Sequence, residues 1–158
     1  MTLPAGTHIG HVHLRALDLD KIREFYVGLL GFELKSEMPG AIFLAAGDYH
    51  HHLAFNTWQT DPRATRNHRA PGLFHIAINL PTEAALAETI SRLEAAGYPI
   101  DGASDHGTHL AVYLRDPEGN GLELAWDRPE AEWPRDADGK IQFVSAPFAF
   151  RAWAQAQG

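Results

Sequence analysis

The chain carries one pattern of elements twice, and this internal repeat limits its fold more than any other feature. In the first copy, apolar alternation and turn signals predict a strand, a helix and two strands at 8–15, about 19–30, 41–46 and 52–57. In the second copy they predict the same series at 73–80, about 82–96, 109–115 and 121–126. A short apolar segment follows each helix, Leu-Leu-Gly-Phe-Glu-Leu at 29–34 and Ala-Ala-Gly-Tyr-Pro-Ile at 95–100. The repeat is therefore βαβββ twice.

The ends of the two helices carry matching signals. Both helices are expected to end at a glycine, Gly31 in the first copy and Gly97 in the second, because glycine best tolerates the left-handed cap position. Asp18 and Thr82 are capping residues at the two starts. Glu83 then places a negative charge in the positive first turn of the second helix.

Three polar residues interrupt the apolar strands of this repeat. His11 and His75 occupy matching places on the two opening strands, so pairing the copies is expected to bring them together. Glu123 stands between two leucines, where a carboxylate is costly to bury unless it is paired or binds a cation. Two imidazoles and one carboxylate form the facial set of non-haem Fe(II) oxygenases. Any one of the three taken alone would more often be a hydrogen-bonded core residue or a solvent-facing one.

The length, composition and charge of the chain exclude several classes of function. The 158 residues suffice for one compact core, and the absence of cysteine excludes disulfides, thiolate catalysis and cysteine-based metal sites. A net charge of −7 without a Lys/Arg cluster argues against a nucleic-acid groove. No signal peptide and no membrane-length apolar run is seen, so we expect a cytoplasmic protein with no membrane partner. The expected partner is a small molecule.

Other histidines and one tyrosine are candidates for chemistry. His13 alternates with His11 on the first strand and is either a substrate contact or a barrel-lining residue bonded to a neighbour. The run at 50–52 places three histidines before a strand, and one neutral imidazole there would suit proton transfer, although a solvated loop end accounts for at least one of them. Tyr113 is either a hydrogen-bond donor to an oxyanion or a core aromatic.

Three phrases resemble one known superfamily. They are G-H-V-H-L-R-A-L-D-L-D at 10–20, E-F-Y-V-G-L-L-G-F-E-L at 24–34 and L-R-D-P-E-G-N-G-L-E-L at 114–124. They are similar to the vicinal oxygen chelate superfamily, which includes glyoxalase I, fosfomycin resistance proteins and extradiol dioxygenases. Tyr49–Trp58, Asp105-His106-Gly107 and the segment 126–134 resemble its catechol 2,3-dioxygenase branch. The implied fold is α+β, with two βαβββ modules forming one open barrel-like mixed sheet around a metal site.

The resemblance also implies roles for individual residues. His11, His75 and Glu123 fall on the iron ligands, with Fe(II) as the metal, Mn(II) as the alternative and O2 as co-substrate. His51 falls on the acid–base histidine and Tyr113 on the catalytic tyrosine, while His106 falls near a histidine that helps hold the substrate. The implied reaction is extradiol cleavage of a catechol to a semialdehyde acid, as in the catabolism of aromatic compounds.

The walls of the substrate pocket are predicted less directly. Candidates that would contact the substrate ring or its oxygens are His13, His52, Phe43, Phe55, Phe74 and Trp126. For the aromatic residues the alternative is plain core packing.

Three rival functions share this fold. In a glyoxalase I-like isomerase using Ni or Zn, His52 would be a fourth metal ligand. The usual fourth ligand is a Glu, however, and no acid occurs between Tyr49 and Trp58, so we favour the dioxygenase. A metal-free binding protein of the antibiotic-sequestering kind typically lacks the ligands that this chain retains. Fosfomycin-type transferases share the ligands but are not associated with an Asp-His-Gly segment.

The whole chain is expected to form a single domain of this superfamily. Its parts are module one at about 7–58, a linker at 59–71, module two at about 72–127 and a C-terminal extension at 128–158. In the extension we predict a short strand at Lys140–Val144 and an amphipathic segment at Phe148–Ala156, which closes the pocket mouth, packs on a second subunit or covers the surface. Because members of this superfamily are often dimers, the resemblance implies a homodimer or higher homo-oligomer.

Overall fold

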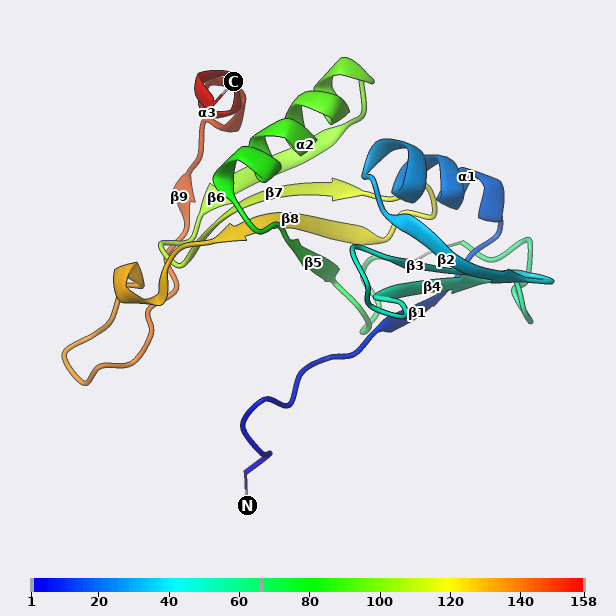
Figure 1. Ribbon diagram of the computed structural model, residues 1–158, viewed down its shortest axis with the longest axis horizontal. Coiled ribbons are helices and arrows are strands. Elements are labelled where there is room, and N and C mark those ends of the chain that lie inside the picture. Colours follow the sequence, from blue (N-terminus) through cyan, green and yellow to red (C-terminus); the bar gives the residue numbers. More distant parts are fainter. Residues whose placement is uncertain (1, 66, 158) are drawn as a thin grey trace. The chain divides into compact units, whose positions relative to one another are not determined.

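The computed structural model describes residues 2–65 and 67–157 and divides into two units, Met1–Arg66 and Asn67–Gly158 (Figure 1). Each unit is an α+β body with its own open, mixed sheet. Both follow the predicted order βαβββ, which confirms the internal repeat.

The first unit builds a sheet of four strands. Its elements are β1 (Val12–Arg15), the α-helix α1 (Leu19–Arg23), the π-helix η1 (Glu24–Leu29), β2 (Glu33–Met38), β3 (Ala41–Ala45) and β4 (Leu53–Asn56). The strand order is β1-β4-β3-β2, with β1 parallel to β4 and the other pairs antiparallel. The first and last strands of the repeat are therefore neighbours in space.

The helix of the first unit differs from the regular α-helix expected over 19–30. Asp18 caps its start as predicted, because its carboxylate accepts hydrogen bonds from the backbone N–H groups of Asp20 and Lys21. From Glu24 onward the helix widens to i→i+5 bonding, as in the 2.9 Å bond from the Leu30 N–H to the Phe25 carbonyl. Tyr26, on this wider turn, is fully buried against Phe55 of β4.

The second unit repeats the arrangement with a longer helix. Its elements are β5 (His75–Asn79), α2 (Glu83–Ala95), β6 (Ile100–Asp105), β7 (His109–Arg115) and β8 (Gly121–Asp127). The sheet order is β5-β8-β7-β6-β9, again with the opening strand parallel to the last strand of the repeat. Thr82 caps α2 as predicted. The apolar face of α2 is buried through Leu86, Ile90 and Leu93.

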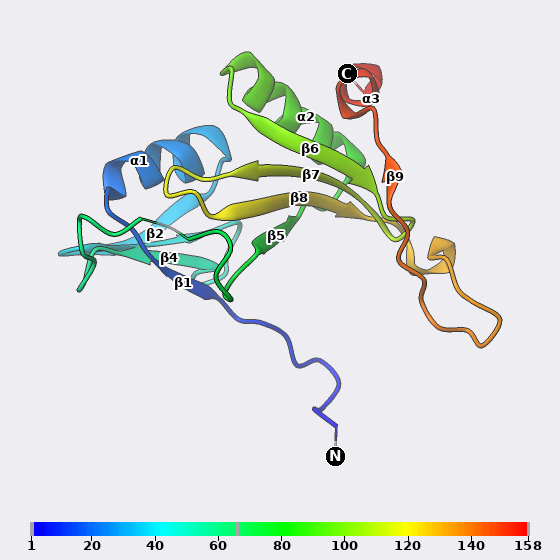
Figure 2. The ribbon, with the colours of Figure 1, turned by 180° about the vertical axis from the view of Figure 1, so that it is seen from behind.

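The C-terminal segment belongs to the second unit. A 3₁₀-helix, η2 (Glu130–Glu132), follows β8, and β9 (Ala146–Pro147) then pairs with β6 and forms the edge of the sheet (Figure 2). The amphipathic segment is a helix, α3 (Phe150–Gln157), that packs beside α2 with an ion pair between Arg151 and Glu94.

The prediction of a strand at Lys140–Val144 was wrong, because the structure has no strand over these residues. Asp136 accepts the backbone N–H of Lys140, and its own N–H donates to the Lys140 carbonyl, so the chain makes a tight turn there. In place of a strand, the described residues of this segment form a single isolated β-bridge, between Arg135 and Ile141. None of the helices among the described residues has the length and apolar character needed to cross a bilayer.

Candidate metal centre

Glu123 is the buried acid of the second unit. It lies on β8, only 5% exposed, between Leu122 and Leu124, as its sequence context indicated. Its two carboxylate oxygens face different histidines: Oε2 lies 2.8 Å from His75 Nε2 and Oε1 lies 2.9 Å from His109 Nε2. Because a buried carboxylate is stable only with partners, these two imidazoles account for its position.

The register of β5 and β8 brings His75 and Glu123 together. His75 pairs with Gly121, two residues before Glu123, so the three residues share one face of the sheet. At Gly121 an added Cβ would lie 2.3 Å from the Phe74 carbonyl oxygen and 3.2 Å from His75 Cβ. Glycine is thus required here for the two strands to approach, and it sets the spacing of the pair.

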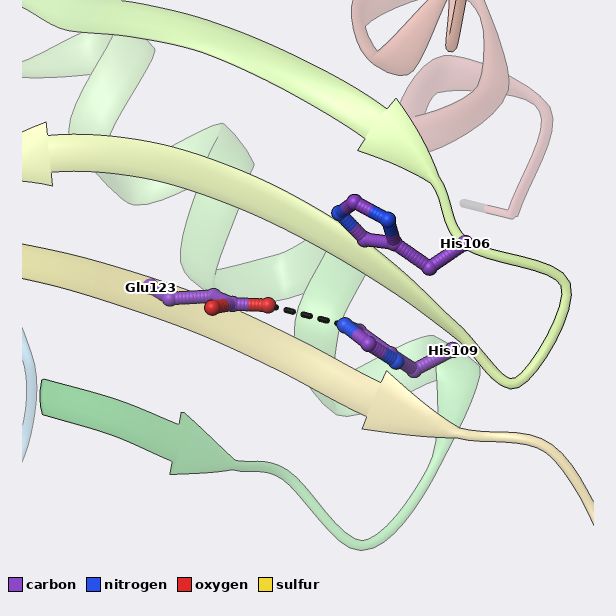
Figure 3. A group of neighbouring side chains, drawn as sticks. All are labelled: His106, His109 and Glu123. Carbon is purple, nitrogen blue, oxygen red and sulfur yellow. Dashed lines mark hydrogen bonds and ion pairs between the residues drawn. The ribbon is translucent and has the colours of Figure 1, made fainter. Parts of the chain in front are cut away.

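His109 is a functional candidate that sequence reasoning missed. In Figure 3 its ring points along the sheet to the Glu123 carboxylate, with the His106 ring nearby. Ligand atoms of His106, His109 and Glu123 all lie within 4.8 Å of one another. Strand alternation could have identified His109 from the sequence, because residues four apart, such as His109 and Tyr113, share a face of a strand. Tyr113 pairs directly with Glu123, so this face of β7 lies beside the carboxylate.

Tyr113 and His106 form a second contact beside this carboxylate. Tyr113 Oη lies 2.6 Å from His106 Nε2, and His106 Nδ1 lies 2.7 Å from the Val144 carbonyl oxygen. A carbonyl only accepts, so Nδ1 of a neutral His106 carries the proton, and Nε2 accepts the hydroxyl proton of Tyr113. Burial, and secondly the charge of Glu123, raises the pKa of Tyr113.

The donor set of the second unit fits a divalent metal. An imidazole nitrogen and a carboxylate oxygen 2.8 Å apart, at His75 and Glu123, are ligand types used by iron, manganese and zinc. Nδ1 of His75 is buried without a hydrogen-bond partner in the described part of the chain. The imidazole is therefore held by Glu123 rather than by a competing hydrogen bond at its other nitrogen.

The first unit gathers the other predicted histidines. His11 lies one residue before β1, and its ring centroid is 4.4 Å from that of His51. His51 also contacts the Phe43 ring at 5.3 Å, and its Nδ1 lies 2.7 Å from His50 Nδ1. Burial, followed by the charges of the surrounding histidines, chiefly His11 and His50, lowers the pKa of His51. His51 thus favours the neutral form, which can accept a proton.

The remaining predicted substrate contacts lie in different environments. His13 is exposed and hydrogen-bonds Asn56 at 2.8 Å, while His52 Nδ1 accepts the Ala46 N–H at 3.3 Å. Phe55 has no exposed surface, which favours the core-packing alternative for that residue. Phe74 is 85% exposed within its unit, and Trp126 of β8 is half-buried.

The structure therefore groups the predicted site residues by unit. The second unit brings together His75, Glu123, Tyr113 and His106, and adds His109. The first unit brings together His11 and His51, with His13 on the adjoining strand. That His11 completes the metal set of the second unit stays a prediction.

Comparison with known proteins identifies the family. A model of the Glyoxalase/Bleomycin resistance protein/Dioxygenase superfamily matches residues 8–124. The chain belongs to this superfamily. Its matched region contains every residue that the sequence analysis assigned to metal binding or catalysis.

Curated relatives within the superfamily include dioxygenases. The chain is 34% identical to catechol-2,3-dioxygenase of Bacillus subtilis (strain 168), over 84% of this chain and 46% of the relative. It is 29% identical to biphenyl-2,3-diol 1,2-dioxygenase 3 of Rhodococcus globerulus, over 75% of this chain and 63% of the relative. The chain thus spans about half to two thirds of the length of these relatives.

Solved structures share the fold. A lactoylglutathione lyase from Agrobacterium tumefaciens is 27% identical, with a TM-score of 0.61 over 78% of this chain and 96% of that protein. A glyoxalase-related enzyme from Fulvimarina pelagi is also 27% identical, with a TM-score of 0.57 over 87% of this chain and 98% of that protein. The chain is therefore similar to dioxygenases in sequence and to a glyoxalase-related enzyme in fold.

Proposed function

We propose that the chain is an extradiol ring-cleaving dioxygenase that acts on a catechol-type aromatic with O2 at a 2-His-1-carboxylate Fe(II) site. The observation that carries this proposal is the pairing of His75 Nε2 with Glu123 Oε2, 2.8 Å apart on adjacent parallel strands. The similarity to catechol and biphenyl-diol dioxygenases supports the substrate class.

His75, Glu123 and, from the first unit, His11 would hold the metal. When bound, Fe(II) would supply a Lewis acid for the two catechol oxygens and a route for electrons between substrate and O2. Mn(II) accepts the same ligands and is the alternative metal. Imidazole ligands bind a metal in their neutral form, so metal affinity would fall at low pH.

His51 would act as the acid–base residue. Its ring is half-buried beside His11, against Phe43, where a neutral imidazole accepts a proton from a catechol hydroxyl and returns it later in the reaction. A Gln at this position keeps hydrogen-bonding groups but cannot take up the proton. Loss of turnover with metal binding retained would support this role.

Tyr113 and His106 would orient the substrate. Because the Tyr113 hydroxyl donates to His106 Nε2, its oxygen keeps lone pairs that can accept a hydrogen bond from a substrate hydroxyl. The Val144 carbonyl fixes the His106 tautomer that makes this possible. His13 and Trp126 remain proposed substrate contacts.

The test is anaerobic loading with Fe(II), followed by catechol, 3-methylcatechol or 2,3-dihydroxybiphenyl in air. We expect a yellow semialdehyde with matching O2 uptake, both lost in His75→Ala and retained in His68→Ala, which changes an exposed histidine of the same unit. Metal-loaded protein that takes up no O2 with any of these catechols would contradict the proposal.

A glyoxalase I-like reaction is the second candidate, favoured by the similarity to a lactoylglutathione lyase structure. It would use His52 as a fourth metal ligand. Against it, His52 Nδ1 already accepts the Ala46 N–H, and β4 contains no carboxylate. Turnover of methylglyoxal with glutathione by Ni- or Zn-loaded protein, without O2 uptake on catechols, would favour this alternative.

A further inference from the structure

The two oxygens of the Glu123 carboxylate have separate tasks in the second unit. Oε2 faces His75 Nε2, the proposed metal ligand, at 2.8 Å, whereas Oε1 faces His109 Nε2 at 2.9 Å. His75 and His109 thus approach the carboxylate at different oxygens.

The Glu123 carboxylate determines which nitrogen of His109 carries the proton, and a buried threonine complements the other nitrogen. Thr108 is 5% exposed, and its Oγ1 lies 2.8 Å from His109 Nδ1. If Nδ1 of a neutral His109 held the proton, the bare Nε2 lone pair would face a carboxylate oxygen and repel it. The favourable arrangement has the Thr108 hydroxyl donating to Nδ1 and the His109 Nε2–H donating to Glu123 Oε1.

We propose that His109, whose Nδ1 accepts the Thr108 hydroxyl in this tautomer, is a positioning residue that anchors Glu123 through Oε1 and leaves Oε2 directed to His75 and the metal. The inference rests on the proposed function, because it assumes that His75 and Glu123 bind a metal. Residues outside the ligand set that orient a ligating carboxylate typically change metal affinity 10–100-fold.

The hydrogen bonds also argue against His106 and His109 as ligands of a separate metal. Both ring nitrogens of His106 already have partners, the Val144 carbonyl and the Tyr113 hydroxyl. Both ring nitrogens of His109 are likewise engaged, by Thr108 and Glu123. A cation held by both imidazoles would displace one hydrogen bond at each, whereas a cation at His75 Nε2 and Glu123 Oε2 displaces only the bond between those two atoms. We therefore assign His109 the role of a hydrogen-bonded support for the carboxylate.

The test measures Co(II) and Fe(II) binding by anaerobic calorimetry, with the Co(II) absorption spectrum as a second readout. We expect His109→Leu to weaken binding about 10–100-fold and to change the spectrum. His109→Gln retains an N–H donor at similar reach and should restore most of the affinity. Thr108→Val should give a smaller loss than His109→Leu, and Thr108→Ser should bind as the parent does.

Controls separate positioning from folding. Thr89→Val removes another buried threonine hydroxyl, which donates to the Ala85 carbonyl on α2, and His68→Leu removes an exposed histidine of the same unit. Both should bind metal as the parent does. Thermal unfolding of each metal-free variant shows whether it folds, and the folded Gln and Ser variants test the inference even if His109→Leu is unstable.

The outcomes distinguish the inference from the function on which it rests. A parent protein that binds neither metal would overturn both. A parent that binds metal while folded His109→Leu binds equally well with an unchanged spectrum would overturn only the role of His109. Failure of His109→Gln to restore binding would also overturn it, because it would indicate direct ligation instead of a hydrogen bond.

Discussion

The two units share one topology but place their polar residues on different strands. In both, the opening strand lies parallel to the last strand of the repeat. In the first unit His13 pairs with Ala54, and at the equivalent register of the second unit Ala77 pairs with Glu123. The repeated frame therefore offers the same pair of positions twice, and only the second unit uses one of them for a carboxylate.

The opening histidines differ in the same way. His75 lies inside β5 opposite Gly121, whereas His11 precedes β1, next to a strand pair that begins at Val12 and Leu53. The second unit thus holds its histidine against a buried acid. The first unit keeps a cluster of neighbouring imidazoles, and none of its described residues, 2–65, is a buried acid. The comparison shows that the duplicated fold fixes the strand positions available to metal ligands. Individual side chains then determine which unit carries the negative charge.

The largest expected effect comes from removing the carboxylate. Glu123→Gln keeps the size of the side chain and an oxygen for His109, but loses the negative charge that attracts the cation. We expect Co(II) or Fe(II) affinity to fall by more than about 100-fold, beyond the range for residues that only support a ligand. Calorimetry measures this, with Glu88→Gln on the exposed face of α2 as the control. Unchanged metal affinity would contradict this difference between the units, because the negative charge that attracts the cation would then belong to another residue.

A smaller effect is expected where the second unit depends on a glycine. Gly121→Ala places a Cβ 2.3 Å from the Phe74 carbonyl oxygen, so β5 and β8 must separate. We expect the free energy of unfolding to fall by about 1–3 kcal/mol and metal affinity to fall with it. Gly102→Ala on β6 is the matched control, since no atom lies within 4 Å of its added Cβ. Equal denaturation midpoints for the two variants would contradict a glycine-dependent register.

The smallest effect concerns the residues that follow the two helices, Phe32 in the first unit and Tyr98 in the second. Each follows a glycine with positive φ, Gly31 or Gly97, and each N–H bonds back to its helix. Only Tyr98 adds a hydroxyl, which donates to the Arg115 carbonyl at 2.8 Å. Tyr98→Phe makes the second unit resemble the first and should cost about 0.5–1.5 kcal/mol at neutral pH.

The same variant has a distinct pH signature. Burial, and secondly Asp116, raises the pKa of Tyr98 to about 12, above the ordinary value of about 10. The folded state therefore favours the protonated phenol, and this stabilisation is complete below pH 10 and is lost as the pH rises toward 12. Denaturation between pH 9 and pH 12 should show a flatter loss of stability for Tyr98→Phe than for the parent. Parallel curves would indicate that the phenol does not contribute.

Local signals in the sequence predicted much of this architecture. Asp18 and Thr82 cap their helices as expected, because capping depends on residues within one turn. The turn at 116–121 also depends on local contacts, because the buried Asp116 carboxylate accepts the N–H groups of Glu118 and Asn120. The strand at Lys140–Val144 failed because Asp136 closes a turn with Lys140, and a short apolar run does not reveal that competition.

The sequence by itself determined the repeat, the helix boundaries and the residue types able to bind a metal, since periodicity and capping act over a few neighbouring positions. Only the tertiary structure decided which groups meet. Strand register placed His75 beside Oε2 of Glu123, and the pairing of β7 with β8 placed His109 beside Oε1. Register depends on contacts between strands distant in the chain, such as the approach that Gly121 permits, so no local pattern could have assigned the two oxygens to their partners.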